Sequence, residues 1–417
     1  MKKRENNGYV NKNIDAYRSI VGDEAIDELF IIAEKLKNRS IQNINSTSFG
    51  GGVVEILSRM VPLMQDLGMN VWWDVIKADA RFFEITKRIH NALHGVDVVL
   101  TRHDLNYFVE VNYYNAESIK RWADIVFIHD PQPIAIIKKK KRKLKNKWAW
   151  RCHVDFSHPK SEVWLFLKKF IEKYDASVFS SPSFSHRLKI RQVLIWPSID
   201  PLSDKNKELS PKFVDSVLDK FNIDKDKPII TQVSRFDYLK DPLGVIRAYK
   251  LVKKYVDCQL VLAGGGAADD PEGKKVLEEV KNEAADDKGI FILHLPPNSH
   301  LEINALQRAS TVILQKSLRE GFGLTVAEAL WKEKPVIASA VGGIPLQISH
   351  KYSGILTYTV EGTAYWIKQL IHEPEYARWL GKRGHLHVKN NFLITRHIQD
   401  YLLLFLSLYN SEDIVYL

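Results

Sequence analysis

Short runs of β-branched and aliphatic residues alternate with longer amphipathic stretches along most of the chain, and this alternation limits the fold more than any other feature. The runs lie at 40–47, 70–76, 123–130, 147–155, 176–181 and 192–200, and again at 228–236, 258–266, 289–297, 310–317 and 335–343. Strands that alternate with helices form parallel sheets covered by helices. We therefore predict an α/β fold, whose functional residues gather where strands end.

The two groups of strand-like runs are separated by a linker-like segment. Residues 197–211, PSIDPLSDKNKELSP, are rich in Pro, Ser, Asp and Lys, which is typical of a connection. A chain of 417 residues also exceeds the roughly 250–300 residues that one core usually serves. We predict a Rossmann-like domain over 1–200, a second over 201–393, and a C-terminal helix in 394–417 that packs back on the first.

The composition indicates a soluble, cytoplasmic protein. Cys152 and Cys258 lie far apart without metal-ligand spacing, and the charged start of the chain leads into no apolar signal segment. The longest apolar stretch, 401–409, is shorter than the roughly 20 residues that span a bilayer. We therefore expect no membrane span.

Part of the net charge of +10 lies in the basic run KKKKRKLKNK at 138–147. Such a run can bind nucleic acid or an anionic membrane, or it can be a solvated loop whose field attracts an anionic substrate. We favour the solvated loop, because no aromatic residues interleave to stack on bases. We expect no nucleic-acid partner.

The segment REGFGLTVAEALWKEKPVIASAVGG at 319–343 carries the strongest chemical signal. A glycine-rich turn between a strand and a helix presents free N–H groups and the positive end of the helix dipole, which suits a phosphate. Glu320 precedes the helix, and Glu328 follows just over two turns later. Two carboxylates in these places can accept charge-assisted hydrogen bonds from sugar hydroxyls.

This E-x7-E segment resembles the signature of the large retaining glycosyltransferase family with GT-B fold. The resemblance implies that Glu320 binds hydroxyls of the donor sugar and Glu328 the ribose of the nucleotide. It places the backbone amides of Phe322, Gly323 and Leu324 on the donor.

Two cations just after the 228–236 strand also match this family. Taken alone, Arg235 and Lys240 in VSRFDYLKDP could be ordinary surface cations. Similar residues in the family bind the nucleotide diphosphate. Stabilising the leaving diphosphate is the main catalytic help that this transfer needs.

Three strings in the first half add candidate residues. The glycines of NSTSFGGG, with Gly51 and Gly52, fit a tight turn equally well, but in the family they let the backbone approach the donor. By the same resemblance, His153 in WRCHVD lines the donor sugar. Asp130 and Gln132 of HDPQP, with Asp155, are candidates for the acceptor site, although a rigid turn explains HDPQP as well; the candidate catalytic residues are Arg235, Lys240, Glu320 and His153.

These first-half strings, with PSIDPLSDKN, are similar to those of trehalose glycosyltransferring synthases and trehalose phosphorylases. The resemblance implies transfer of glucose from UDP- or ADP-glucose to glucose, with retention. It implies small-molecule sugars as partners, no required cofactor and Mg²⁺ at most as a stimulant. We predict no bound metal, since no Asp-x-Asp motif ends a strand. A phosphorylase, a glycan or lipid acceptor, the choice of base and a homodimer remain open.

Overall fold

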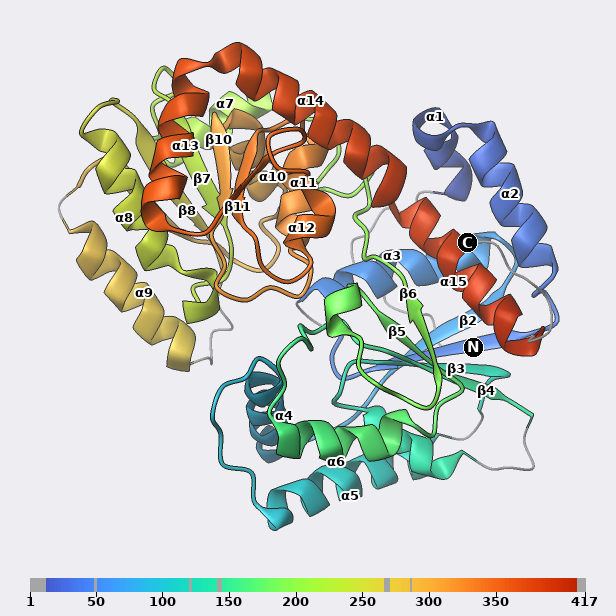
Figure 1. The fold of residues 1–417 in the computed structure, drawn as a ribbon. Helices are drawn as coiled ribbons and strands as arrows, with labels where there is room; N and C mark the ends of the chain where they lie inside the picture. The colour runs from blue at the N-terminus through green and yellow to red at the C-terminus, as the bar shows by residue number, and fades with distance from the viewer. Residues whose placement is uncertain are drawn as a thin grey trace.

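A computed structural model describes residues 13–48, 51–119, 122–140, 145–265, 271–285 and 287–410. It contains two six-stranded sheets, each the centre of one α/β domain, and the strands within each sheet are parallel. Figure 1 shows the two domains side by side, with helices on both faces of each sheet. The predicted α/β class with two Rossmann-like domains is confirmed.

The first sheet has the order β2-β1-β3-β4-β5-β6. Its strands are β1 (Ser40–Asn45), β2 (Asn70–Val75), β3 (Ile125–His129), β4 (Lys147–Arg151), β5 (Ala176–Phe179) and β6 (Arg191–Leu194). One face packs on α2 (Asp23–Glu34) and α3 (Gly52–Asp66), and the other on α4 (Ala80–Leu93), α5 (Arg102–Ser118) and α6 (Ser161–Ile171). The shorter elements of this half are η1 (Ile14–Tyr17), α1 (Arg18–Val21), η2 (Ile134–Lys139) and η3 (Pro182–Phe184).

The second sheet has the order β12-β11-β10-β7-β8-β9. Its strands are β7 (Ile229–Val233), β8 (Gln259–Gly264), β9 (Ile290–His294), β10 (Val312–Gln315), β11 (Val336–Ser339) and β12 (Ile355–Thr357). One face packs on α8 (Pro242–Lys253), α9 (Pro271–Ala284) and α13 (Val360–His372), and the other on α7 (Pro211–Lys220), α10 (His300–Ala309) and α11 (Leu324–Trp331). The remaining elements are η4 (Tyr238–Lys240), α12 (Ile344–Gln347) and α14 (Pro374–Asn391).

The chain crosses between the domains twice, and the two crossings are hydrogen-bonded to each other. The Ile199 N–H donates to Phe392 O at 2.9 Å, and the Ile394 N–H donates to Ile199 O at 3.0 Å. After the second crossing, α15 (Ile394–Tyr409) packs its apolar face on α2 and α3 of the first domain. Figure 1 shows this return of the red C-terminal helix to the blue N-terminal helices.

The sequence-based strands overlap the observed ones, with one omission. β12 was not predicted, because its three residues are too few to show a period. Gly68 takes the left-handed conformation just after the end of α3, with φ 80°. None of the helices in the described segments is long and apolar enough to cross a membrane.

Parts of three segments named above lie outside the described residues: 141–144 of the basic run, residue 266 at the end of the run 258–266, and residues 49–50 of NSTSFGGG. At the described end of the basic run, Lys140 pairs with Asp175 at 2.7 Å and Lys139 pairs with Glu117. These contacts engage two charges of the run within the first domain.

Candidate active site

The carboxyl ends of the two sheets meet at two close contacts between the domains. A Cβ atom added to Gly52 would lie 3.0 Å from Leu324 Cδ1, so the first turns of α3 and α11 touch. A Cβ atom added to Gly321 would lie only 2.6 Å from His153 O, so the two polar turns also touch. Residues from both glycine-rich turns are therefore brought into one site.

Glu320 is the central residue that the second domain contributes to the candidate site. Its side chain is nearly buried, and Oε2 accepts hydrogen bonds from Lys240 Nζ at 2.7 Å, Ser317 Oγ at 3.1 Å and Gln315 Nε2 at 3.4 Å. Lys240 lies in η4, which follows β7, whereas Gln315 ends β10 and Ser317 follows it; β7 and β10 are neighbours in the sheet. Lys240 and Glu320, two residues that the sequence places separately in the candidate site, are thus in direct contact.

Glycines after β11 support this turn. A Cβ atom added to Gly342, whose φ is 57°, would lie 1.6 Å from Glu320 O, and one added to Gly343 would lie 2.6 Å from Gly321 O. The Gly343 N–H donates to Gly321 O at 3.1 Å. Larger residues at these two positions would push the two loops apart. Close packing therefore explains why the VGG string has glycine at 342 and 343.

The N-termini of α3 and α11 have free N–H groups that could bind an anion. Both helices begin after a glycine with positive φ, Gly51 at 84° and Gly323 at 82°, and neither receives a side-chain cap within the described chain. The first N–H groups of a helix carry partial positive charge and bind phosphate readily. Since Gly52 and Leu324 are in contact, both helix ends reach the same region.

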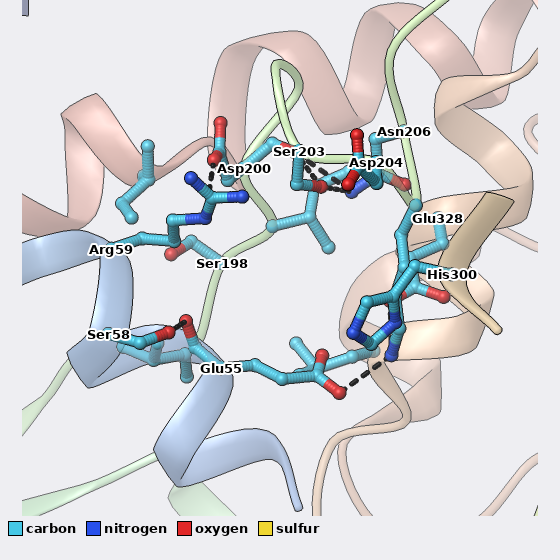
Figure 2. Close-up of a pocket in the computed structure, with 15 residues that line it drawn as sticks. Glu55, Ser58, Arg59, Ser198, Asp200, Ser203, Asp204, Asn206, His300 and Glu328 are labelled. Atoms are coloured by element: carbon cyan, nitrogen blue, oxygen red, sulfur yellow. Dashed lines mark hydrogen bonds and ion pairs between the residues drawn. The ribbon is translucent and has the colours of Figure 1, made fainter. Parts of the chain in front are cut away.

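Glu328 lies on the wall of a cavity between the domains (Figure 2). Its side chain is 3% exposed, and Oε2 has no hydrogen-bond partner among the described residues. Lys205 Nζ lies 3.8 Å from Glu328 Oε1 and 2.6 Å from Glu55 Oε1 on α3. Figure 2 shows Glu328 and His300 on one side of the cavity and Arg59 on the other, with the Glu55 side chain extending toward His300. Sequence reasoning missed Lys205 and Glu55, since no local pattern distinguishes them from solvated charges.

Arg235 is mostly exposed, and its Nη2 pairs with Asp237 at 2.9 Å. Across the site, α4 of the first domain ends in His90 and His94, whose Nε2 atoms are 3.0 Å apart. Burial, together with the charges of His94, Arg235 and Lys240, lowers the pKa of His90 to about 3. The two cations therefore lie near enough to His90 for their charges to affect it, and the sequence did not identify α4 as part of the site.

His153 and Asp130 meet at the carboxyl edge of the first sheet. The backbone N–H of His153 donates to Asp130 Oδ1 at 2.9 Å, and Asp130 takes a left-handed φ of 67°. His153 Nε2 lies 3.1 Å from His129 Nδ1. The structure thus joins two predicted site residues and adds His129, which precedes Asp130 in HDPQP and was not singled out.

The other two predicted acceptor residues are held more tightly. Asp155 is 2% exposed, and its Oδ1 accepts from the N–H and the Oγ of Ser157 at 2.9 and 2.6 Å. Gln132 is half-buried, and its O accepts from Asn112 Nδ2 at 3.0 Å. Gln132 Oε1 is buried without a partner among the described residues. Their part in acceptor binding stays a prediction.

Asp130→Asn is expected to make the protein more stable and, if the predicted activity is present, less active. Burial raises the pKa of Asp130 to about 6, so this carboxyl favours its protonated form in the fold and ionising it costs stability as pH rises from about 4 to 6. Asn keeps the acceptor for the His153 N–H and tolerates the left-handed backbone. Thermal unfolding should show a gain of up to about 3 kcal/mol at pH 8 that vanishes near pH 4.

The activity of Asp130→Asn tests the predicted acceptor-binding role of Asp130 separately from its effect on stability. If Asp130 accepts a hydroxyl as a carboxylate, wild-type kcat/KM falls below about pH 6 and that fall is absent in Asp130→Asn. If Asp130→Asn has unchanged activity at pH 8, the predicted role of Asp130 in acceptor binding is rejected.

Two family models match this chain. One, described as "Trehalose synthase, N-terminal domain", covers residues 43–186, and the other, "Glycosyl transferases group 1", covers 215–387. A trehalose synthase of Thermococcus litoralis is 45% identical over 94% of this chain and 96% of its own length. A trehalose phosphorylase of Pleurotus pulmonarius is 30% identical over 83% of this chain but only 54% of its own length.

Solved structures of low sequence identity show the same fold. A sucrose-phosphate synthase from Thermosynechococcus elongatus superposes with a TM-score of 0.69 at 19% identity, over 90% of this chain and 100% of that one. An α,α-trehalose 6-phosphate synthase from Burkholderia multivorans gives 0.73 at 15% identity, over 90% and 100%. The predicted GT-B arrangement is confirmed.

Proposed function

The chain belongs to the trehalose synthase family of group 1 glycosyltransferases, and from this premise we propose that it transfers glucose from a nucleoside-diphosphate glucose to free glucose. The product is α,α-trehalose, with retention at the donor carbon. The first domain binds the acceptor and the second binds the donor, with the division near residue 200.

The buried carboxylate of Glu328 carries this proposal. An ionised carboxyl group with one buried and unpartnered oxygen is costly, unless a ligand supplies the missing donors. Two neighbouring ribose hydroxyls satisfy it with charge-assisted hydrogen bonds. Phosphate, the substrate of a phosphorylase, has no such hydroxyls, so this residue favours a nucleotide.

The rest of the donor fits around the touching helix ends. Arg235, Lys240 and the N-termini of α3 and α11 neutralise the diphosphate, with the amides of Phe322, Gly323 and Leu324 along it. Glu320 accepts hydroxyls of the donor sugar, and Lys240 holds its carboxylate in place. His153, which touches Gly321, lines the same sugar.

We propose a front-face reaction for the transfer. The bond from the donor carbon to the diphosphate oxygen breaks while a bond to the acceptor oxygen forms on the same face. The acceptor's proton passes to the leaving diphosphate, and Arg235 and Lys240 stabilise the charge that develops there. Glu320 is occupied by three donors, so it fits a binding role better than that of a nucleophile. Asp130, Gln132 and Asp155 orient the acceptor.

The proposal includes a cytoplasmic enzyme with small-molecule sugar partners and with Mg²⁺ as no more than a stimulant. The decisive test incubates the full chain with UDP-glucose or ADP-glucose, with and without glucose, and identifies products by NMR. We expect glucose-dependent α,α-trehalose in equal amount to released nucleotide, and the better donor identifies the base.

Other products would redirect the proposal. Trehalose breakdown that requires phosphate and no nucleotide would support a phosphorylase. Nucleotide release without trehalose would keep the donor site and reject glucose as the acceptor. A trapped glycosyl-enzyme adduct would reject front-face attack.

A further inference from the structure

A chain of three polar side chains crosses the carboxyl edge of the first sheet. Asn43 lies in β1, His129 ends β3 and His153 follows β4, and these strands are neighbours in the sheet. Asn43 Oδ1 lies 3.1 Å from His129 Nε2, and His129 Nδ1 lies 3.1 Å from His153 Nε2. Asn43 is 4% exposed and His129 is 1% exposed, so water does not compete for these contacts.

The orientation of the Asn43 amide sets the direction of the chain. Its Nδ2 donates to Trp72 O at 3.4 Å, and the reverse orientation would place two acceptors against each other there. The Oδ1 atom therefore faces His129, and a carbonyl oxygen can only accept. It follows that His129 Nε2 carries a hydrogen.

Both histidines are neutral near pH 7. Burial and the positive charge of Arg151 lower the pKa of His129 to about 3, and burial, Arg151 and His129 lower that of His153 well below its ordinary value. A neutral imidazole has one donor and one acceptor nitrogen. His129, protonated on Nε2, must accept at Nδ1, and so His153 must donate from Nε2.

From this chain of hydrogen bonds we infer that Asn43 and His129 are positioning residues, which hold His153 as the tautomer with a hydrogen on Nε2 and a bare Nδ1. The effect of this tautomer on sugar binding rests on the proposed function. No described residue donates to His153 Nδ1, and His153 as a whole residue is only partly buried. A sugar hydroxyl that reaches this nitrogen must therefore donate its proton, and a fluorine in its place is rejected.

The wild-type tautomer can be measured by NMR without turnover. In the full chain labelled with ¹⁵N-histidine, two-bond couplings at pH 7.5 distinguish bare from protonated ring nitrogens. His153 is expected to be protonated on Nε2 in nearly every molecule. His385 is an internal standard of the opposite tautomer, because its Nδ1 donates to Trp331 O at 2.6 Å. A His153 protonated on Nδ1 would overturn the inference, whether or not the enzyme makes trehalose.

Two variants test the origin of the tautomer. Asn43→Leu removes the fixed acceptor, so His153 should become a mixture of tautomers while His385 is unchanged. His129→Gln keeps a donor toward Asn43 and an acceptor toward His153, so it should preserve the wild-type tautomer. Asn43→Leu, which loses the amide contact, is expected to lower kcat/KM about tenfold. His129→Gln should retain most of the wild-type kcat/KM. A wild-type tautomer in Asn43→Leu would reject the role of Asn43.

Discussion

Lys240→Ala is expected to lower kcat about 10²–10³-fold, the effect of removing one charge-stabilising donor from an active site. Lys240 is mostly buried, it contacts Glu320 at 2.7 Å, and its charge lies close enough to lower the pKa of His90. The proposed leaving diphosphate would lose one of two cations, and Glu320 would lose its only charged donor among the described residues. Steady-state kinetics with saturating donor measure this change.

Lys227→Ala provides the matched control. Lys227 precedes β7, whereas Lys240 follows it, and Lys227 pairs with Asp257 at 2.8 Å on the surface. Its loss should leave kcat unchanged, since exposed ion pairs contribute about 0–1 kcal/mol to stability. Thermal unfolding of both variants separates lost catalysis from lost folding. A folded Lys240→Ala enzyme with less than a tenfold loss would reject the leaving-group role.

Glu328→Gln is expected to raise the Kd of the nucleoside diphosphate about 10–100-fold. Hydrogen bonds to a charged group contribute about 1.5–3 kcal/mol, and a neutral amide of the same size keeps part of them. Glu328 Oε2 is buried without a partner among the described residues, so a ligand contact there has little competition. Calorimetric titration of wild type and variant with UDP and ADP measures the loss, and Glu361→Gln, at an exposed position in the first turn of α13, is the control.

A 2′-deoxynucleotide shows whether the lost contact is with ribose. Wild-type protein should bind it more weakly than the ribonucleotide, while Glu328→Gln should bind both with similar affinity, because the two changes remove one interaction. Independent, additive losses would show that Glu328 contacts another part of the ligand. In that case the cavity between Glu55 and Glu328 needs a different occupant.

Local patterns in the sequence were sufficient for the fold class and for much of the proposed donor site. Alternating strand and helix runs predict parallel α/β domains, since each element must bury one apolar face. The turn between β10 and α11 places Glu320, Gly323 and Glu328 by spacing alone, because a helix fixes the relation of residues along it. The resemblance added Arg235, Lys240 and the first-domain strings.

Tertiary structure alone decided which distant side chains touch. Asn43 and His129 lie 86 positions apart, and Lys205 lies 150 from Glu55, so no periodicity links them. The contact of Gly321 with His153 depends on how two domains pack. Packing also supplied the Ser157 contacts that hold Asp155, and the burial that raises the pKa of Asp130. Spacing along a strand or helix determines local geometry, whereas hydrogen-bond partners, burial and pKa depend on neighbours that only the packed chain brings together.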